Sequence, residues 1–122
     1  MPTRRVQTAA LLDLVCIVAF VALGRGAHDE GSALAGTLRI AAPFVIAAAA
    51  GWAGVRAWRR PMALWETGVP IWIVTVAVGM VLRHFVFDRG TALPFIIVAT
   101  SMLGLLLLGW RAIAQWRWPD TA

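Results

Sequence analysis

The sequence is short of charge and of several residue types that soluble proteins use. Only 14% of its 122 residues are charged, one is cysteine, none is tyrosine, and all 11 basic residues are arginine. Since a water-soluble domain needs more polar surface than this, that class of protein is excluded. The single thiol of Cys16 cannot form an internal disulfide, and no cluster of cysteine and histidine offers a zinc site.

The sequence patterns of known catalytic sites are missing too. No GxSxG, HExxH, Walker or dinucleotide motif occurs, and the only adjacent carboxylates are Asp29 and Glu30 in an expected loop. We therefore expect no enzymatic activity and no cofactor. His28 and His84 could in principle ligate a haem across a bundle, but their place at the membrane edge favours ordinary interface histidines.

Long apolar runs are what the chain has in abundance. Hydrophobic residues make up 61% of it, and four runs cover residues 6–24, 38–58, 69–87 and 92–110. About 20 helical residues cross a hydrocarbon core, so the sequence predicts one all-α transmembrane domain over residues 1–122, a bundle of four helices. The first run also resembles a cleavable signal peptide, but Asp13 at its entrance favours a retained helix.

The arginines are distributed unequally between the two sides of the expected membrane domain. Seven lie with the termini and the second connection, and four lie on the opposite side. The positive-inside rule then predicts a plasma membrane protein with both termini in the cytoplasm. Six tryptophans gather near the same boundary and predict an aromatic belt: Trp52, Trp58, Trp65, Trp110, Trp116 and Trp118. The net charge of +5 is not confined to one face, so no nucleic-acid partner is expected.

The second and fourth runs share a pattern that indicates an internal repeat. Pro43-Phe44 recurs as Pro94-Phe95, and Gly51-Trp52 recurs as Gly109-Trp110, with about two extra turns in the later copy. This pattern favours two tandem helical hairpins, with any site at their interface. Shared composition of apolar segments is the alternative explanation.

Asp13 is the most unusual residue of the four runs. An ionisable group inside a membrane helix is costly unless it faces protein or water. Counting residues along the spans places Trp52, Thr75 and either Thr100 or Ser101 at the same depth as Asp13. Of these, Asp13, Trp52 and Thr75 form a possible proton or substrate site. The alternative is a carboxylate that ties helices together or caps the first helix.

A second possible site lies on the opposite side of the membrane. Arg25, Arg39 and Arg83 could bind an anion or a lipid headgroup there, and the alternative is that they are snorkelling side chains at helix ends. On the third run Gly79 would let another helix approach closely.

The order of these motifs resembles that of a bacterial and archaeal membrane family, domain of unknown function 3054. The resemblance covers nearly the whole chain and rests on Asp13, Gly24-Arg25, His28, Pro43-Phe44, Gly51-Trp52, Trp72, Thr75, Gly79-Met80, Arg83, Phe95 and Gly109-Trp110-Arg111. It implies a four-helix membrane protein and supplies no activity. Size, four spans and an acid in the first helix also resemble the small multidrug resistance transporters, whose coupling residue is a glutamate rather than an aspartate.

Two functions follow as hypotheses. The first is a small transporter-like protein in which Asp13 exchanges a proton. The alternative is a non-catalytic membrane scaffold, or an accessory subunit of a larger complex that binds lipids or partner helices. In either case we expect membrane lipids as partners, together with a homo-oligomer or a partner membrane protein.

Overall fold

Four long helices account for most of the molecule. The computed structural model describes residues 2–25, 33–85 and 93–117, and all regular secondary structure in these ranges is helical. The long helices are α1 (Pro2–Arg25), α2 (Ala33–Val55), α3 (Val69–Phe85) and α4 (Leu93–Arg117). All four lie in stretches long and apolar enough to cross a membrane. The predicted all-α bundle of four membrane helices is therefore confirmed.

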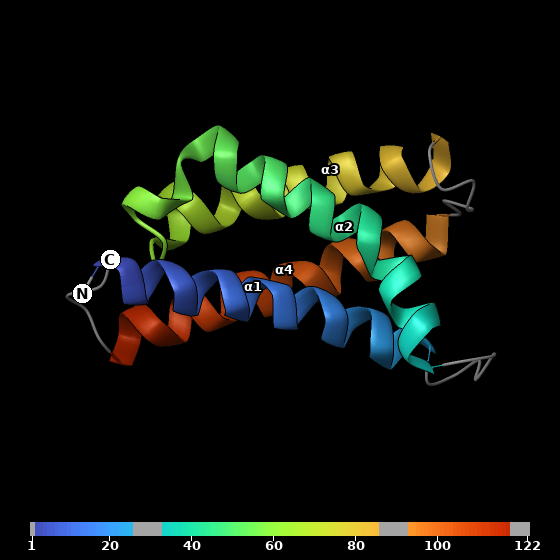
Figure 1. The fold of residues 1–122 in the computed structure, drawn as a ribbon, viewed down its shortest axis with the longest axis horizontal. Coiled ribbons are helices and arrows are strands. Elements are labelled where there is room, and N and C mark those ends of the chain that lie inside the picture. The colour runs from blue at the N-terminus through green and yellow to red at the C-terminus, as the bar shows by residue number, and fades with distance from the viewer. Residues whose placement is uncertain (1, 26–32, 86–92, 118–122) are drawn as a thin grey trace.

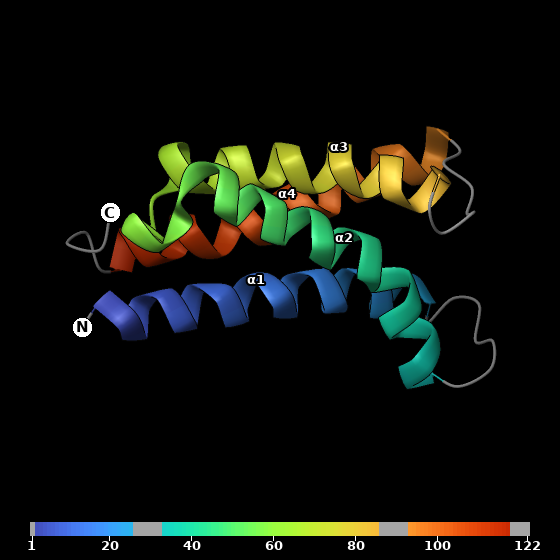
Figure 2. The same cartoon turned by 45° about the horizontal axis from the view of Figure 1, so that its top comes forward.

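The helices alternate in direction and pack side by side. The start of α1, the end of α4 and the connection between α2 and α3 lie together at one end of the bundle, here called the terminal end (Figure 1). Helix α2 runs obliquely: it crosses α1 near the opposite end and lies along α3 towards the terminal end (Figure 2). Helix α1 contacts both α2 and α4, so the four helices close into a bundle.

Several helix boundaries differ from the predicted ones. Helix α1 begins at Pro2 rather than at residue 6, since proline suits a first helical turn. Helix α2 covers Ala33–Val55 rather than 38–58 because Arg56 adopts a left-handed backbone with φ 53°, which ends the helix. Helix α3 is described as far as Phe85, and the last two residues of the predicted span 69–87 lie outside the described residues.

The connection between α2 and α3 is itself wound into short helices. A 3-10 helix (Ala57–Arg59) follows the left-handed turn, and a π-helix (Leu64–Gly68) leads directly into α3. Helix α4 also departs from prediction: it continues to Arg117, whereas the predicted span ended at residue 110. The apolar run does end at residue 110. The next residue, Arg111, is buried among protein side chains, so its charge does not have to reach the membrane surface and the helix continues past it.

Three phenylalanines form the centre of the bundle away from the terminal end. The rings of Phe20, Phe44 and Phe95 lie 6.0 to 6.3 Å apart, and we call them the aromatic layer. Phe44 is fully buried, and its ring occupies the space left by Gly79: a Cβ at that glycine would lie 2.5 Å from the ring. The close approach of helices expected at Gly79 is confirmed, between α2 and α3. On the far side of this layer the Arg83 guanidinium lies 3.9 Å from the centre of the Phe95 ring.

Candidate functional site

The carboxylate of Asp13 forms a buried ion pair with Arg111. Asp13 on α1 is 3% exposed and Arg111 on α4 is 0% exposed. Nη1 donates to Oδ1 and Nη2 donates to Oδ2, each over 2.8 Å. This is the two-pronged pairing that matches the planar guanidinium to a carboxylate. The pair joins residues 98 positions apart in the chain and ties the first helix to the last.

Two tryptophans complete the environment of the carboxylate. The Trp52 indole on α2 donates to Oδ2 over 2.8 Å, and the Trp110 indole on α4 donates to Oδ1 over 2.9 Å. Asp13 thus accepts four hydrogen bonds, about as many as an ionised carboxylate can accept. We call Asp13, Trp52, Trp110 and Arg111 the polar layer. Because every neighbour at the oxygens is a donor, this layer is built for the ionised carboxylate, and the charge of Arg111 balances it.

The α2–α3 connection closes the polar layer at the terminal end. Nε of Arg111 donates to the Pro61 carbonyl oxygen over 3.0 Å, and Nη1 also donates to the Leu107 carbonyl over 3.3 Å. The guanidinium of Arg111 therefore donates four hydrogen bonds in all. Gly68 leaves room for the stem of the side chain, since a Cβ there would lie 2.7 Å from Cδ of Arg111. The connection consequently adds one hydrogen bond to the two that Asp13 makes with the arginine.

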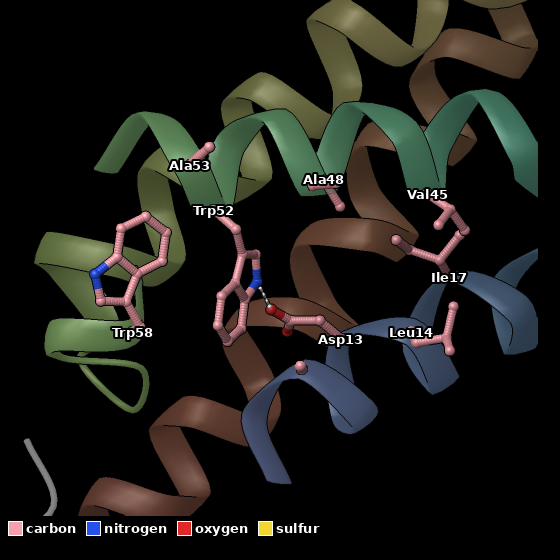
Figure 3. Close-up of a pocket in the computed structure, with 10 residues that line it drawn as sticks. Asp13, Leu14, Ile17, Val45, Ala48, Trp52, Ala53 and Trp58 are labelled. Carbon is pink, nitrogen blue, oxygen red and sulfur yellow. Dashed lines mark hydrogen bonds between the residues drawn. The ribbon is translucent and has the colours of Figure 1, made fainter. Parts of the chain in front are cut away.

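A groove opens beside the polar layer, between α1 and α2. Its volume is about 380 Å³. Figure 3 shows Asp13, Trp52 and Trp58 in the half of the groove nearer the terminal end, and Ile17 and Val45 in the other half. The remaining walls are mostly alanine and leucine: Ala10, Leu14, Ala48, Ala49 and Ala53. The chemistry of this lining suits an apolar chain with a polar group at one end.

The structure brings together only part of the predicted proton or substrate site. Trp52 is hydrogen-bonded to Asp13, at the depth that counting residues gave. Thr75 makes no hydrogen bond to them: it is fully buried on α3, and its hydroxyl has no hydrogen-bond partner among the described residues. On α4 the residues that meet Asp13 are Trp110 and Arg111 rather than Thr100 or Ser101, which the residue count predicted. The predicted three-residue site is thus replaced by the polar layer, in which Thr75 has no part.

The structure does not test the predicted anion site on the opposite side, because the side chain of one of its three arginines lies outside the described residues. Arg39 is exposed on α2, whereas Arg83 lies over the ring of Phe95. The side chain of Arg25 is outside the described part of the chain, as are His28, Asp29, Glu30, Asp88 and Arg89.

Sequence reasoning missed Arg111, the partner that decides the chemistry of Asp13. It assigned this arginine to the cytoplasmic boundary as a topology signal after the fourth helix, and the structure corrects this to a buried position inside α4. A usable signal was present in the repeat: matching Gly109-Trp110 to Gly51-Trp52 places Trp110 at the depth of Trp52, and hence Arg111 beside Asp13.

The aromatic belt is also smaller than predicted. Trp52 and Trp110 are only partly exposed and donate to Asp13 instead of marking the boundary. Three others have exposed side chains, as boundary anchors would: Trp58, Trp65 and Trp116. Trp118 lies outside the described residues.

Among the described residues no group of three or more histidine, cysteine, aspartate or glutamate side chains could hold a metal ion. A family model described as "Protein of unknown function (DUF3054)" matches residues 10–114, a range that contains the whole polar layer. No curated protein and no solved structure matched the chain. Since the family model covers most of the chain, this protein belongs to the DUF3054 family.

Proposed function

We propose that this protein is a non-catalytic accessory or scaffold protein of the plasma membrane that binds lipids or partner helices. The observation that carries this proposal is the saturation of Asp13: both oxygens accept two hydrogen bonds each, one from Arg111 and one from a tryptophan. A carboxylate held in this way ties helices together. Its acceptor positions are all occupied by hydrogen bonds, so none is left at which it could take up a proton during transport.

The proposed orientation places both termini in the cytoplasm. Exposed arginines support it, because Arg4, Arg5, Arg56 and Arg59 all lie at the terminal end with their side chains exposed. The positive-inside rule assigns such an end to the cytoplasm. Four helices of this length enclose little volume, so we further propose that the protein acts as a homo-oligomer or with a partner membrane protein.

A second candidate, the small transporter, is favoured by one specific observation. Asp13 belongs to the lining of the α1–α2 groove as well as to the polar layer. If the ion pair opened, the carboxylate would face that groove, where a substrate could exchange with a proton. In the transporter Asp13 therefore has to change its protonation state during a cycle.

The titration of Asp13 distinguishes the two candidates. The chain has four aspartates, and replacing Asp29, Asp88 and Asp120 by asparagine leaves Asp13 as the sole site for a carbon-13 label on aspartate carboxyls. The carboxyl resonance of Asp13 is then followed by NMR in lipid nanodiscs across the physiological pH range. A constant resonance is expected for the accessory protein. A titration step in that range would overturn the proposal in favour of the transporter.

A further inference from the structure

Three arginines just after α2, Arg56, Arg59 and Arg60, differ in whether a carboxylate balances their charge. Arg60 forms an ion pair with Glu66 in the α2–α3 connection. The exposed side chains of Arg56 and Arg59 make no hydrogen bond or ion pair within the described ranges. Two positive charges are thus left unbalanced next to Trp58, which lines the terminal-end mouth of the α1–α2 groove (Figure 3).

The backbone of Arg56 adds a second, independent observation. Its φ of 53° and ψ of 56° lie in the left-handed region, and it is the only residue other than glycine with a positive φ among those described. Glycine is the residue that suits such a helix-ending turn, since it has no Cβ to clash. An arginine held in this conformation points to a function for its side chain rather than for the turn.

The groove supplies a place for an apolar chain beside these charges. Its walls run along α1 from Ala10 to Ile17 and along α2 from Ala53 back to Val45, about 12 Å in helix length. Both stretches belong to membrane spans, so the open side of the groove faces lipid chains. Apolar walls inside the membrane and unbalanced positive charge at its boundary together complement a lipid with an anionic headgroup.

We propose that the α1–α2 groove binds one acyl chain of an anionic phospholipid and that Arg56 and Arg59 hold its phosphate. This inference deepens the proposed accessory function, on which it rests, by naming the class of ligand. It differs from the anion site expected at Arg25, Arg39 and Arg83, which lies at the opposite end of the bundle. The lining of the groove between α3 and α4 is apolar apart from the indole N–H groups of its tryptophans. Neither lining contains an arginine, but Trp58 of the α1–α2 groove lies between Arg56 and Arg59 in the sequence, whereas Trp65 of the other groove is followed by Glu66.

Native mass spectrometry of the purified full chain tests the headgroup part. Phosphatidylglycerol and phosphatidylcholine with identical acyl chains are titrated, and the wild type is expected to bind the former more tightly by about fivefold for each arginine. The double variant Arg56→Gly, Arg59→Gln should lose this preference. Glycine suits the left-handed turn at residue 56, and circular dichroism checks that the double variant is folded.

Arg4→Gln is the matched control, since Arg4 is an exposed arginine at the same end of the bundle, on α1 and outside the groove lining. Its preference for phosphatidylglycerol should equal that of the wild type. Equal binding of the two lipids by the wild type, or an equal loss in the Arg4 variant, would overturn the proposal.

Two alanine substitutions test the groove part. Ala49→Phe fills the groove and should lower binding of both lipids at least fivefold, whereas Ala50→Phe, at the neighbouring exposed position outside the lining, should leave it unchanged. Undiminished binding by the Ala49 variant would overturn the assignment of the acyl chain to the groove. If the Asp13 resonance titrates and the lipid preference is intact, only the accessory function is overturned. If the Asp13 resonance is constant and the wild type shows no lipid preference, only this inference is overturned.

Discussion

Two layers of side chains hold the four helices together, and they use opposite physical means. The polar layer joins α1, α2 and α4 through directional hydrogen bonds to one carboxylate. The aromatic layer, about 10 Å further along α1, joins the same helices through ring packing alone. In a membrane, lipid chains are as apolar as the side chains, so burial of apolar surface by itself gives little preference for one partner helix over another. The polar layer supplies that preference, because Asp13 has to meet Arg111.

The largest expected effect is in the polar layer. Asp13→Ala should lower the free energy of unfolding by about 3–5 kcal/mol, since Arg111 is left as an uncompensated buried charge. The double variant Asp13→Leu, Arg111→Met should recover most of this loss because no charge remains buried. Reversible unfolding of the detergent-solubilised chain by SDS, followed by circular dichroism, measures both. A double variant as unstable as the single one would show that the pair does not act as a unit.

Beside each layer a glycine makes room for one of its side chains, which allows a matched comparison. Gly68→Ala meets Cδ of Arg111 and Gly79→Ala meets the Phe44 ring, and each should cost about 1–3 kcal/mol. A second substitution separates the layers: Phe44→Leu should relieve the clash at residue 79, but Arg111→Lys should not relieve the one at residue 68. Lysine also has a Cδ that would meet the new methyl group, and it lacks the two-pronged geometry that Asp13 requires.

The same unfolding measurement applies to these glycine variants. Gly54→Ala is their control, because nothing lies within 4 Å of a Cβ there and alanine favours a helix. It should be neutral or stabilising by up to about 1 kcal/mol. If Arg111→Lys restored the stability of the Gly68→Ala variant, this would contradict the contrast between directional contacts in the polar layer and packing contacts in the aromatic layer.

A conservative swap in the aromatic layer should have a smaller effect. Phe95→Leu keeps an apolar side chain and removes the ring under Arg83, so a loss of about 1 kcal/mol is expected. Thermal unfolding in detergent gives this difference, with Phe20→Leu as the reference, since no cation of the described residues lies over the Phe20 ring. A loss as large as that of Asp13→Ala would mean that the aromatic layer also depends on specific partners.

The smallest expected effect concerns the labelling of Cys16, the only thiol of the chain, in the folded protein. It lies one turn beyond Asp13 on α1, is 9% exposed and does not line the groove. Its labelling by a small water-soluble maleimide should be slow in the folded protein and complete after denaturation in SDS. Rapid labelling of the folded chain would mean that water enters between the two layers, which a dry ion pair does not allow.

The sequence by itself determined the four membrane helices and identified Asp13 as the residue that needed an explanation. Length and apolarity decide membrane helices locally, since each span satisfies its own backbone hydrogen bonds. Residue counting also placed Trp52 at the depth of Asp13, because rise per residue is fixed in a helix.

Only the tertiary structure decided which cation meets that carboxylate. Counting along an apolar run assumes that the first arginine after it leaves the membrane, so Arg111 was assigned to the boundary and α4 was ended at residue 110. The assumption fails when the charge is neutralised by another helix, and that neutralisation depends on a residue 98 positions away. The same partnership filled the acceptor positions of Asp13 and left Thr75 out of the site. Local sequence fixes how deep a residue lies in a helix, but the side chain it faces is set by how the helices pack.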